Sequence, residues 1–287
     1  MALLFTIKLT NRIVIEPGTG NKNYWRDLWA YRGLFYFLAW RDVLVRYKQA
    51  AIGIGWSVIK PLLTIGAMWF IGWLFNSKVP DGVPRILLVG AAILPWTFFS
   101  TAFSEASSSL INNSNLLAKV YFPRLIVPAG AIIVCLIDFF ISFVLLVIIM
   151  LFYKYIPDWR ILLMPLFLLL AVITAMGTGI LIAALNVKYR DFRYIVGFIV
   201  QFGLYASPVA FSSDNIYQNA RVPEVVKFIY SLNPMVGVID GFRWSILGSS
   251  VSIYMPGFLC SIAISFFFLF LGIWYFRKTE RAFADII

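Results

Sequence analysis

The sequence RDVLVRYKQAAIGIGWSVIKPLL, residues 41–63, places a basic segment directly before the first long apolar segment of the chain. Arg41, Arg46 and Lys48 lie within its first eight residues, and most of the residues that follow are apolar. Lys and Arg concentrate on the cytoplasmic side of membrane-spanning helices and fix the orientation of those helices. This stretch therefore predicts an integral membrane protein whose N-terminal side stays in the cytoplasm.

The composition of the whole chain leads to the same conclusion. Hydrophobic residues make up 61% of the sequence, charged residues only 13%, and the mean hydropathy is +0.87. Soluble domains carry roughly 25% charged residues, so the surplus apolar surface needs lipid around it. With six spans, 287 residues leave no room for a separate soluble catalytic domain. We expect a cytoplasmic tail and interfacial helix over residues 1–53, then one membrane domain over residues 54–287.

Charge and residue usage exclude several functions. The net charge is +11, but the Lys and Arg residues lie beside apolar segments, which favours anionic lipid over nucleic acid. The chain has no His, which removes the commonest general base and metal ligand. Cys135 and Cys260 fall in apolar stretches and are interpreted as small buried hydrophobes. We therefore predict no catalytic residue and no metal site, and we expect residues 1–20 to form a cytoplasmic tail with a short strand.

Six segments are long and apolar enough to cross a bilayer, which takes roughly 20 residues. They are residues 54–75, 86–110, 125–153, 161–186, 194–211 and 256–276. With the N-terminus inside, 16 Lys and Arg residues fall on the cytoplasmic side and seven on the other. This asymmetry predicts that both termini are cytoplasmic.

Two regions outside these spans have distinctive patterns. Residues 24–40 hold eight aromatic side chains in seventeen positions, which favours an interfacial amphipathic helix at the inner leaflet over a helix packed on the bundle. Residues 222–232 and 235–247 are apolar, too short to span, and separated by Asn233 and Pro234. They are expected to form re-entrant half-helices, so that residues 212–255 form an outer gate.

Four polar residues lie within the predicted spans: Lys60, Glu105, Asp138 and Gln201. A charge at the bilayer centre costs about 2.5–3.5 kcal/mol on insertion scales, so such residues usually serve a function. Lys60 is close enough to the inner boundary to reach the headgroups, and Glu105 borders a weakly apolar stretch. Asp138 lies deepest and is expected to face either a cavity or a partner charge. The scattered positions of the acids argue against a proton-coupled carrier.

The sequence contains no phosphate-binding P-loop, since residues 18–22 match only part of one and are interpreted as a flexible loop. Transport driven by nucleotide would therefore need a separate ATPase. Two cytoplasmic loops could dock such a partner: residues 112–124, with a short helix around Leu116 and Leu117, and the charged residues 186–194. The alternative is that both are solvated loops that only anchor the spans.

Aromatic residues make up 18% of the chain, and two clusters of them lie inside spans. The clusters are Trp69, Phe70 and Trp73, and Trp96, Phe98 and Phe99. Most such side chains belong to interfacial belts or to packing. The alternative is that some line a conduit, where flat rings cover the faces of sugar rings and bind them weakly enough to let a glycan slide.

The chain resembles the ABC-2-type permeases of polysaccharide export in the order and spacing of six segments. They are residues 41–63, GAAILPWTFF at 90–99, KVYFPR at 119–124, NVKYRDFRY at 186–194, SPV at 207–209 and LNPMVGVIDGFR at 232–243. The resemblance implies an all-α membrane protein with six transmembrane helices in the type V exporter fold. It also implies a homodimer bound to two ATP-binding-cassette subunits, which hold the ATP and Mg²⁺, and no cofactor on this chain.

The resemblance assigns roles to residues of this chain. The implied ATPase-coupling residues are Arg41, Asp42, Arg46, Lys48, Asn115, Leu116, Leu117, Lys119, Arg190 and Asp191. The candidates for a channel or gate are Trp69, Phe70, Trp73, Trp96, Phe98, Phe99, Asp138, Tyr205, Asn233, Pro234 and Arg243.

The expected function is export of an undecaprenyl-linked polysaccharide (O-antigen, teichoic acid or capsule) across the bacterial inner membrane. Three alternatives stay open. One is an ABC-2 permease for a small lipid or drug. Another is an intramembrane enzyme of glycan assembly, which would need convergent acids. The third is a stand-alone carrier or channel.

Overall fold

The computed structural model describes residues 24–48, 55–75, 79–80, 82–120, 122–248, 251–280 and 283. The predicted N-terminal strand and the loop at residues 18–22 lie outside these residues. The described part of the chain contains helices only. In order they are α1 (Tyr24–Ala30), α2 (Arg32–Lys48), α3 (Gly55–Leu74), α4 (Arg85–Asn112), α5 (Ser114–Lys119), α6 (Ile126–Phe152), the 3₁₀ turn η1 (Trp159–Leu163), α7 (Met164–Lys188), α8 (Phe192–Ala206), α9 (Asp214–Tyr217), α10 (Glu224–Ser231), α11 (Pro234–Leu247) and α12 (Met255–Thr279).

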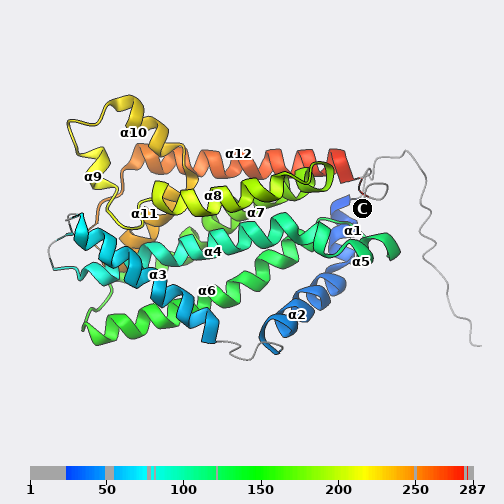
Figure 1. Ribbon diagram of the computed structural model, residues 1–287, viewed down its shortest axis with the longest axis horizontal. Coiled ribbons are helices and arrows are strands. Elements are labelled where there is room, and N and C mark those ends of the chain that lie inside the picture. The colour runs from blue at the N-terminus through cyan, green and yellow to red at the C-terminus, as the bar shows by residue number, and fades with distance from the viewer. Residues whose placement is uncertain are drawn as a thin grey trace, which may run out of the picture.

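The long helices form an elongated bundle with two distinct ends (Figure 1). At one end lie α1, α5 and the C-terminal end of α12, which we call the α5 end. At the other lie α9 and α10, which we call the α10 end. The described N-terminal and C-terminal residues are therefore on the same side of the bundle.

Helix α4 lies at the centre of the bundle, packed against α3, α6, α7, α8 and α11. Residues 86–96 of this helix are apolar on every side, and a helix of that kind is normally buried. Eighteen of its 28 residues are buried, including a run of small residues from Gly90 to Ala92 that lets neighbouring helices approach. Its polar hydroxyls bond to the helix itself, as Thr97 does to the carbonyl of Ile93 at 2.9 Å.

The predicted spans correspond closely to helices, and the all-α membrane fold is confirmed. Helices α3, α4, α6, α7 (with η1) and α12 are long and apolar enough to cross a membrane, and the bent pair of α10 and α11 would make a sixth if counted as one span. That pair bends by 83° at Asn233 and Pro234, as expected of re-entrant half-helices. The predicted span at 194–211 is shorter than expected, because helix α8 ends at Ala206 where Ser207 adopts an extended backbone before Pro208.

Helix α8 has only 15 residues, or about 22 Å at 1.5 Å per residue, which is less than the roughly 30 Å of a bilayer core. It nevertheless runs along the bundle beside α4 and α7, in the direction opposite to α7 (Figure 1). Residues 207–211 continue the chain toward the α10 end without helical structure. This non-helical backbone is covered by protein, which is the condition for such backbone within a membrane.

The aromatic segment at 24–40 forms two helices rather than one, since the chain turns at Tyr31. Tyr24 is buried at the α5 end, and α2 continues to Lys48 and packs along α6. Only Leu38 and Ala39 of α2 are buried against the bundle. Tyr36 and Trp40 of α2, like Trp29 of α1, are more than half exposed. The structure therefore combines the two alternatives, an exposed aromatic face and a helix packed on the bundle.

Candidate functional site between helices α2, α4 and α6

Asp138 is the centre of a cluster of polar side chains from four helices. It lies at the twelfth residue after the start of α6, about 18 Å along the helix and deep within the span. One carboxylate oxygen accepts from the Arg46 guanidinium at 2.9 Å. The other accepts from the Tyr47 hydroxyl at 2.7 Å and from the Ser57 hydroxyl at 2.6 Å. The expectation that Asp138 faces a partner charge is therefore confirmed by its contacts with α2 and α3.

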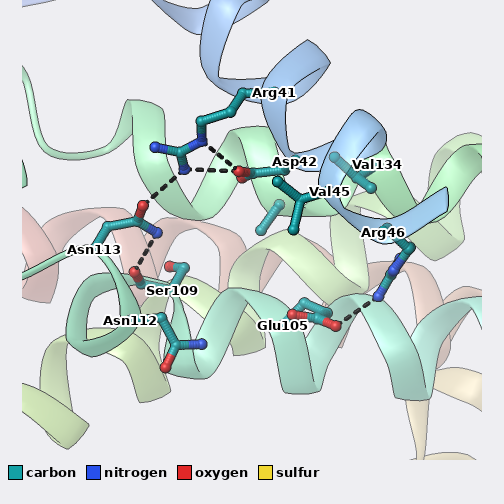
Figure 2. Close-up of a pocket in the computed structure, with 10 residues that line it drawn as sticks. Arg41, Asp42, Val45, Arg46, Glu105, Ser109, Asn112, Asn113 and Val134 are labelled. Atoms are coloured by element: carbon teal, nitrogen blue, oxygen red, sulfur yellow. Dashed lines mark hydrogen bonds and ion pairs between the residues drawn. The ribbon is translucent and has the colours of Figure 1, made fainter. Parts of the chain in front are cut away.

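Arg46 also binds a second acid. Its other terminal nitrogen donates to Glu105 of α4 at 2.6 Å, as Figure 2 shows. The Arg46 side chain is only 27% exposed, and two carboxylates balance the charge of its guanidinium. Burial raises the pKa of Tyr47 above its usual value, and the hydrogen bond that its hydroxyl donates to Asp138 raises it further. Tyr47 therefore stays protonated as a donor.

A polar cavity of about 390 Å³ adjoins this cluster (Figure 2). Its lining residues come from α2, the C-terminal part of α4 with the α4–α5 junction, and α6: Arg41, Asp42, Val45, Arg46, Glu105, Ser109, Asn112, Asn113, Ala131 and Val134. Two cationic and two anionic side chains face it, so the lining carries no net charge. Water in such a cavity would lower the cost of holding charged groups at this depth.

A second contact ties α2 to the loop before α5. The Arg41 guanidinium donates to the Asp42 carboxylate at 2.6 and 2.8 Å and to the side-chain oxygen of Asn113 at 2.9 Å. Asn113 is the residue between α4 and α5, and its amide donates to the carbonyl of Ser109 at 2.9 Å. Helix α2 is therefore linked both to the base of α5 and to the middle of α4 and α6.

The other implied coupling residues occupy different environments, and all but Lys48 lie at the α5 end. Asn115 and Lys119 of α5 are exposed, Leu116 is half-buried, and Leu117 is buried among the ends of α4, α6 and α7. Lys48 is exposed at the end of α2, and Arg190 and Asp191 are exposed in the turn between α7 and α8. The structure thus brings Arg41, Asp42 and Arg46 together at one site. The others lie apart on the surface, except for Leu116 and Leu117, which hold α5 against the bundle.

The C-terminal end of α12 and the residue after it contact other segments at the α5 end. Glu280 accepts from the backbone nitrogen of Arg124 at 2.8 Å, while the Arg124 guanidinium donates to the Glu280 carbonyl at 2.7 Å. The Arg277 guanidinium lies 4.9 Å from the centre of the Tyr24 ring. Burial raises the pKa of Glu280, although the contacts with Arg124 act in the opposite direction. These contacts join the first helix, the loop after α5 and the last helix.

The aromatic clusters are placed differently from each other. Trp69, Phe70 and Trp73 of α3 are 42–59% exposed and point away from the bundle. Trp96, Phe98 and Phe99 of α4 are at most 6% exposed and belong to the core. Tyr205 of α8 is exposed.

Arg243 of α11 is fully buried near the α10 end. Its guanidinium donates to three backbone carbonyls, those of Leu88 at 3.0 Å, Val209 at 3.0 Å and Phe211 at 2.8 Å. These carbonyls belong to α4 and to the non-helical segment that follows α8. One side chain therefore satisfies irregular backbone at membrane depth and holds the half-helix α11 against it.

The sequence reasoning named Glu105 and Asp138 as polar residues within spans but did not pair them with Arg46, and it missed Tyr47, Ser57 and Asn113. The available signal was physical: two acids in apolar helices require a cation, and residues 41–48 are a basic segment directly before the first predicted span. Among the residues that the structure describes, no group of acids and cysteines is arranged to hold a metal ion.

Comparison with known proteins places this architecture in a family. The profile of the ABC-2 type transporter family matches residues 33–247. This chain belongs to that family, and it is a transporter membrane subunit with several spanning helices.

The chain is also similar to proteins whose cargo is named. It is 27% identical over 219 residues to the O-antigen export system permease protein RfbA of Myxococcus xanthus, covering 76% of this chain and 82% of that protein. It is 25% identical over 257 residues to the O-antigen export system permease protein RfbA of Klebsiella pneumoniae, covering 86% of this chain and 92% of that protein.

Proposed function

We propose that this chain is the membrane-spanning subunit of an ATP-driven exporter that moves a lipid-linked polysaccharide, with O-antigen as the favoured cargo. The observation that carries this proposal is the likeness to two O-antigen export permeases over most of both chains, within a matched family of ABC-2 type transporters. The carrier lipid would be an undecaprenyl lipid, and teichoic acid or capsular glycan are the related cargoes.

The driving force would come from two separate ATP-binding-cassette subunits that bind ATP and Mg²⁺. The exposed residues Asn115 and Lys119 of α5, with Arg190 and Asp191, would form the surface offered to them at the α5 end. Lys48, at the far end of α2, follows Tyr47 and so lies near the middle of α6. That end would face the cytoplasm of a bacterial inner membrane, with both termini inside, as the distribution of Lys and Arg favours.

A second copy of the chain would complete the conduit. Helices α3 and α8 have largely open faces, with four buried residues in α3 and one in α8. Exposed aromatic side chains such as Trp69, Trp73 and Tyr205 lie on them and would border the glycan path. The half-helices α10 and α11 would form its outer end.

The contacts of α2 suggest how motion would reach the spans. A displacement of α5 would be passed to α2 through Asn113 and Arg41, and from α2 to α4 and α6 through Arg46. The permease would supply the path and the partner the free energy. Two other functions, export of a small lipid or drug and glycan assembly within the membrane, share the fold or the location but have no named relative in their support.

The test is to delete the gene in its native host and to measure lipid-linked glycan on each side of the inner membrane. Accumulation of full-length glycan inside, restored to normal by the intact gene, is expected. A strain that assembles no glycan would favour an enzyme, and one that exports glycan normally would contradict the proposal. In vesicles, the purified chain alone should move no glycan, whereas the chain with its ATPase and ATP should do so.

A further inference from the structure

A second cavity, of about 310 Å³, lies between α4, α7, α8, α11 and α12. Its floor consists of buried side chains of α4 and α11, namely Trp96, Phe99, Phe103 and Met235. Its rim is partly exposed and comes mainly from α7, α8 and α12, with Thr178, Ile199 and Phe268 among its residues. The cavity is therefore a recess that opens toward the outside of the bundle.

The lining determines what could occupy this recess. Aromatic and aliphatic side chains form almost all of it, and its two polar side chains are already hydrogen-bonded within the protein. Thr178 donates to the carbonyl of Thr174 at 2.7 Å. Asn233 accepts from the backbone nitrogen of Met235 at 3.0 Å and donates to the hydroxyl of Ser207 at 3.0 Å. The fitting occupant is therefore apolar, because a polar one would lose its own hydrogen bonds on entering.

The position and size of the recess further restrict which apolar molecule could occupy it. Thr178 lies 14 residues after the start of α7 and Phe268 13 residues after the start of α12, each about 20 Å along a spanning helix. The recess is thus at the depth of lipid chains. Apolar cavities of about 150 Å³ stay dry and bind benzene, so this one would hold roughly a dozen carbon atoms.

We propose that this recess binds one hydrocarbon chain of a membrane lipid. A flexible chain can pass the rim and reach the α4 floor, whereas the side chains of a second helix would stop at the rim residues. Gly203 is part of the arrangement, because a methyl group on it would lie 2.5 Å from Cη2 of Trp96. The glycine lets the Trp96 ring close against α8 and form a continuous wall.

The bound chain would also touch the outer half-helices, since Asn233 and Pro234 line the recess at the bend between α10 and α11. Chain occupancy would therefore stabilise the bend seen here. This site requires only that the protein reside in a membrane, so its failure would leave the proposed transport function unaffected.

The test uses the full-length protein in nanodiscs with phosphatidylglycerol that carries a photoactivatable diazirine in one acyl chain. After illumination, labelled residues are mapped by mass spectrometry. Label is expected on Trp96, Phe99 or Phe103, which are at most 6% exposed and should be reached only through the recess. Thr178→Phe, which fills the recess, should lower this labelling several-fold. The matched control Ile148→Phe, on the exposed face of α6, should not change it.

Further variants keep the test decisive if Thr178→Phe fails to fold. Ile199→Trp fills the recess from α8, and Phe268→Ala enlarges it and should preserve or increase the label. Competition with unlabelled undecaprenyl phosphate or with unlabelled phosphatidylglycerol would show whether the site prefers a polyprenyl or an acyl chain. Three results would overturn the proposal. They are the absence of label on the α4 residues of the floor, equal labelling of the wild type and of the variants that fill the recess, and failure of both unlabelled lipids to compete.

Discussion

Arg46 joins α2 to two membrane-spanning helices through ion pairs. It sits near the end of α2 and holds carboxylates of both α4 and α6, while Tyr47 and Ser57 complete the shell of Asp138. Removing the guanidinium would leave two acids at membrane depth with fewer partners. The cost should exceed that of a surface ion pair, because the groups are only 26–43% exposed.

A double-mutant cycle of Arg46→Gln and Asp138→Asn tests this view. We expect a coupling energy of about 1–3 kcal/mol from unfolding in detergent, between the values for exposed and fully buried pairs. The matched control is the pair of Lys227 and Glu224, which are 2.8 Å apart within α10, with Glu224 83% exposed. That pair should give less than about 0.5 kcal/mol. Equal coupling in both cycles would show that Arg46 is not a structural link.

Glu280 supplies a prediction about pH at the α5 end. Its pKa is raised in the folded protein, mainly by burial, so the folded state holds this proton more tightly than the unfolded state. The stabilisation from protonated Glu280 is full below its ordinary value of 4.5 and is lost as the pH rises through the raised pKa.

Glu280→Gln should therefore match or exceed the wild type in melting temperature near pH 8, and the difference should shrink toward pH 4. The amide oxygen can still accept from the backbone nitrogen of Arg124, so the change removes the charge and keeps this contact. Thermal unfolding across this pH range provides the measurement. A variant that is less stable at pH 8, with an unchanged pH slope, would contradict this interpretation.

The packing of helices α7 and α12 against each other depends on two glycines. A methyl group on Gly177 would collide with the backbone of Leu269, and one on Gly272 with the carbonyl of Gly177. Close backbone approach at small residues is the usual way in which membrane helices gain packing energy. The two helices could not keep this separation with any larger residue at these positions.

Gly177→Ala should destabilise the protein by about 1–3 kcal/mol, the range for overpacking in a tight interior. Gly66→Ala in α3 is the matched control, because nothing lies within 4 Å of a methyl group there. It should leave the melting temperature unchanged or slightly higher, since alanine favours helix. Similar melting temperatures for the two variants would mean that the crossing tolerates wider spacing.

The sequence was sufficient to predict most elements, because membrane spans are set by the length of apolar runs. The helices α3, α6 and α12 begin and end within a few residues of the predicted spans. The burial of Trp96, Phe98 and Phe99 was not predicted, because an aromatic side chain in a membrane span can face either lipid or the protein core. Similarly, Leu116 and Leu117 are adjacent, and only tertiary packing decides which one is buried.

The candidate site was predictable only in part, because its residues come together only when the whole chain has folded. Asp138 was expected to face either a cavity or a partner charge, but its partner lies 92 positions earlier in the sequence and Glu105 is 59 positions from the same arginine. Such pairings depend on how α2 packs along α6, which no local pattern encodes. Charge asymmetry, by contrast, is a property of the whole sequence, and the orientation that it predicts stays a prediction.

The proposed docking of an ATPase at the α5 end predicts that charge on the exposed face of α5 affects export. Lys119→Glu reverses a charge at the surface offered to the ATPase, and like charges facing each other at an interface cost several kcal/mol. Export at fixed partner concentration should fall about tenfold or more, since each 1.4 kcal/mol of lost binding is a factor of ten. Transport of labelled glycan into inverted vesicles provides the measurement, with membrane insertion and melting temperature unchanged.

Lys154→Glu is the matched control for this reversal, because Lys154 is also exposed but follows α6 at the opposite end of the bundle. It should export normally. Leu117→Asp separates contact from folding, because Leu117 is 7% exposed and its loss should lower the melting temperature as well as export. If Lys119→Glu exports as the wild type does while Leu117→Asp fails, α5 would serve to stabilise the α5 end, and the ATPase contact would have to lie on the turn that contains Arg190 and Asp191.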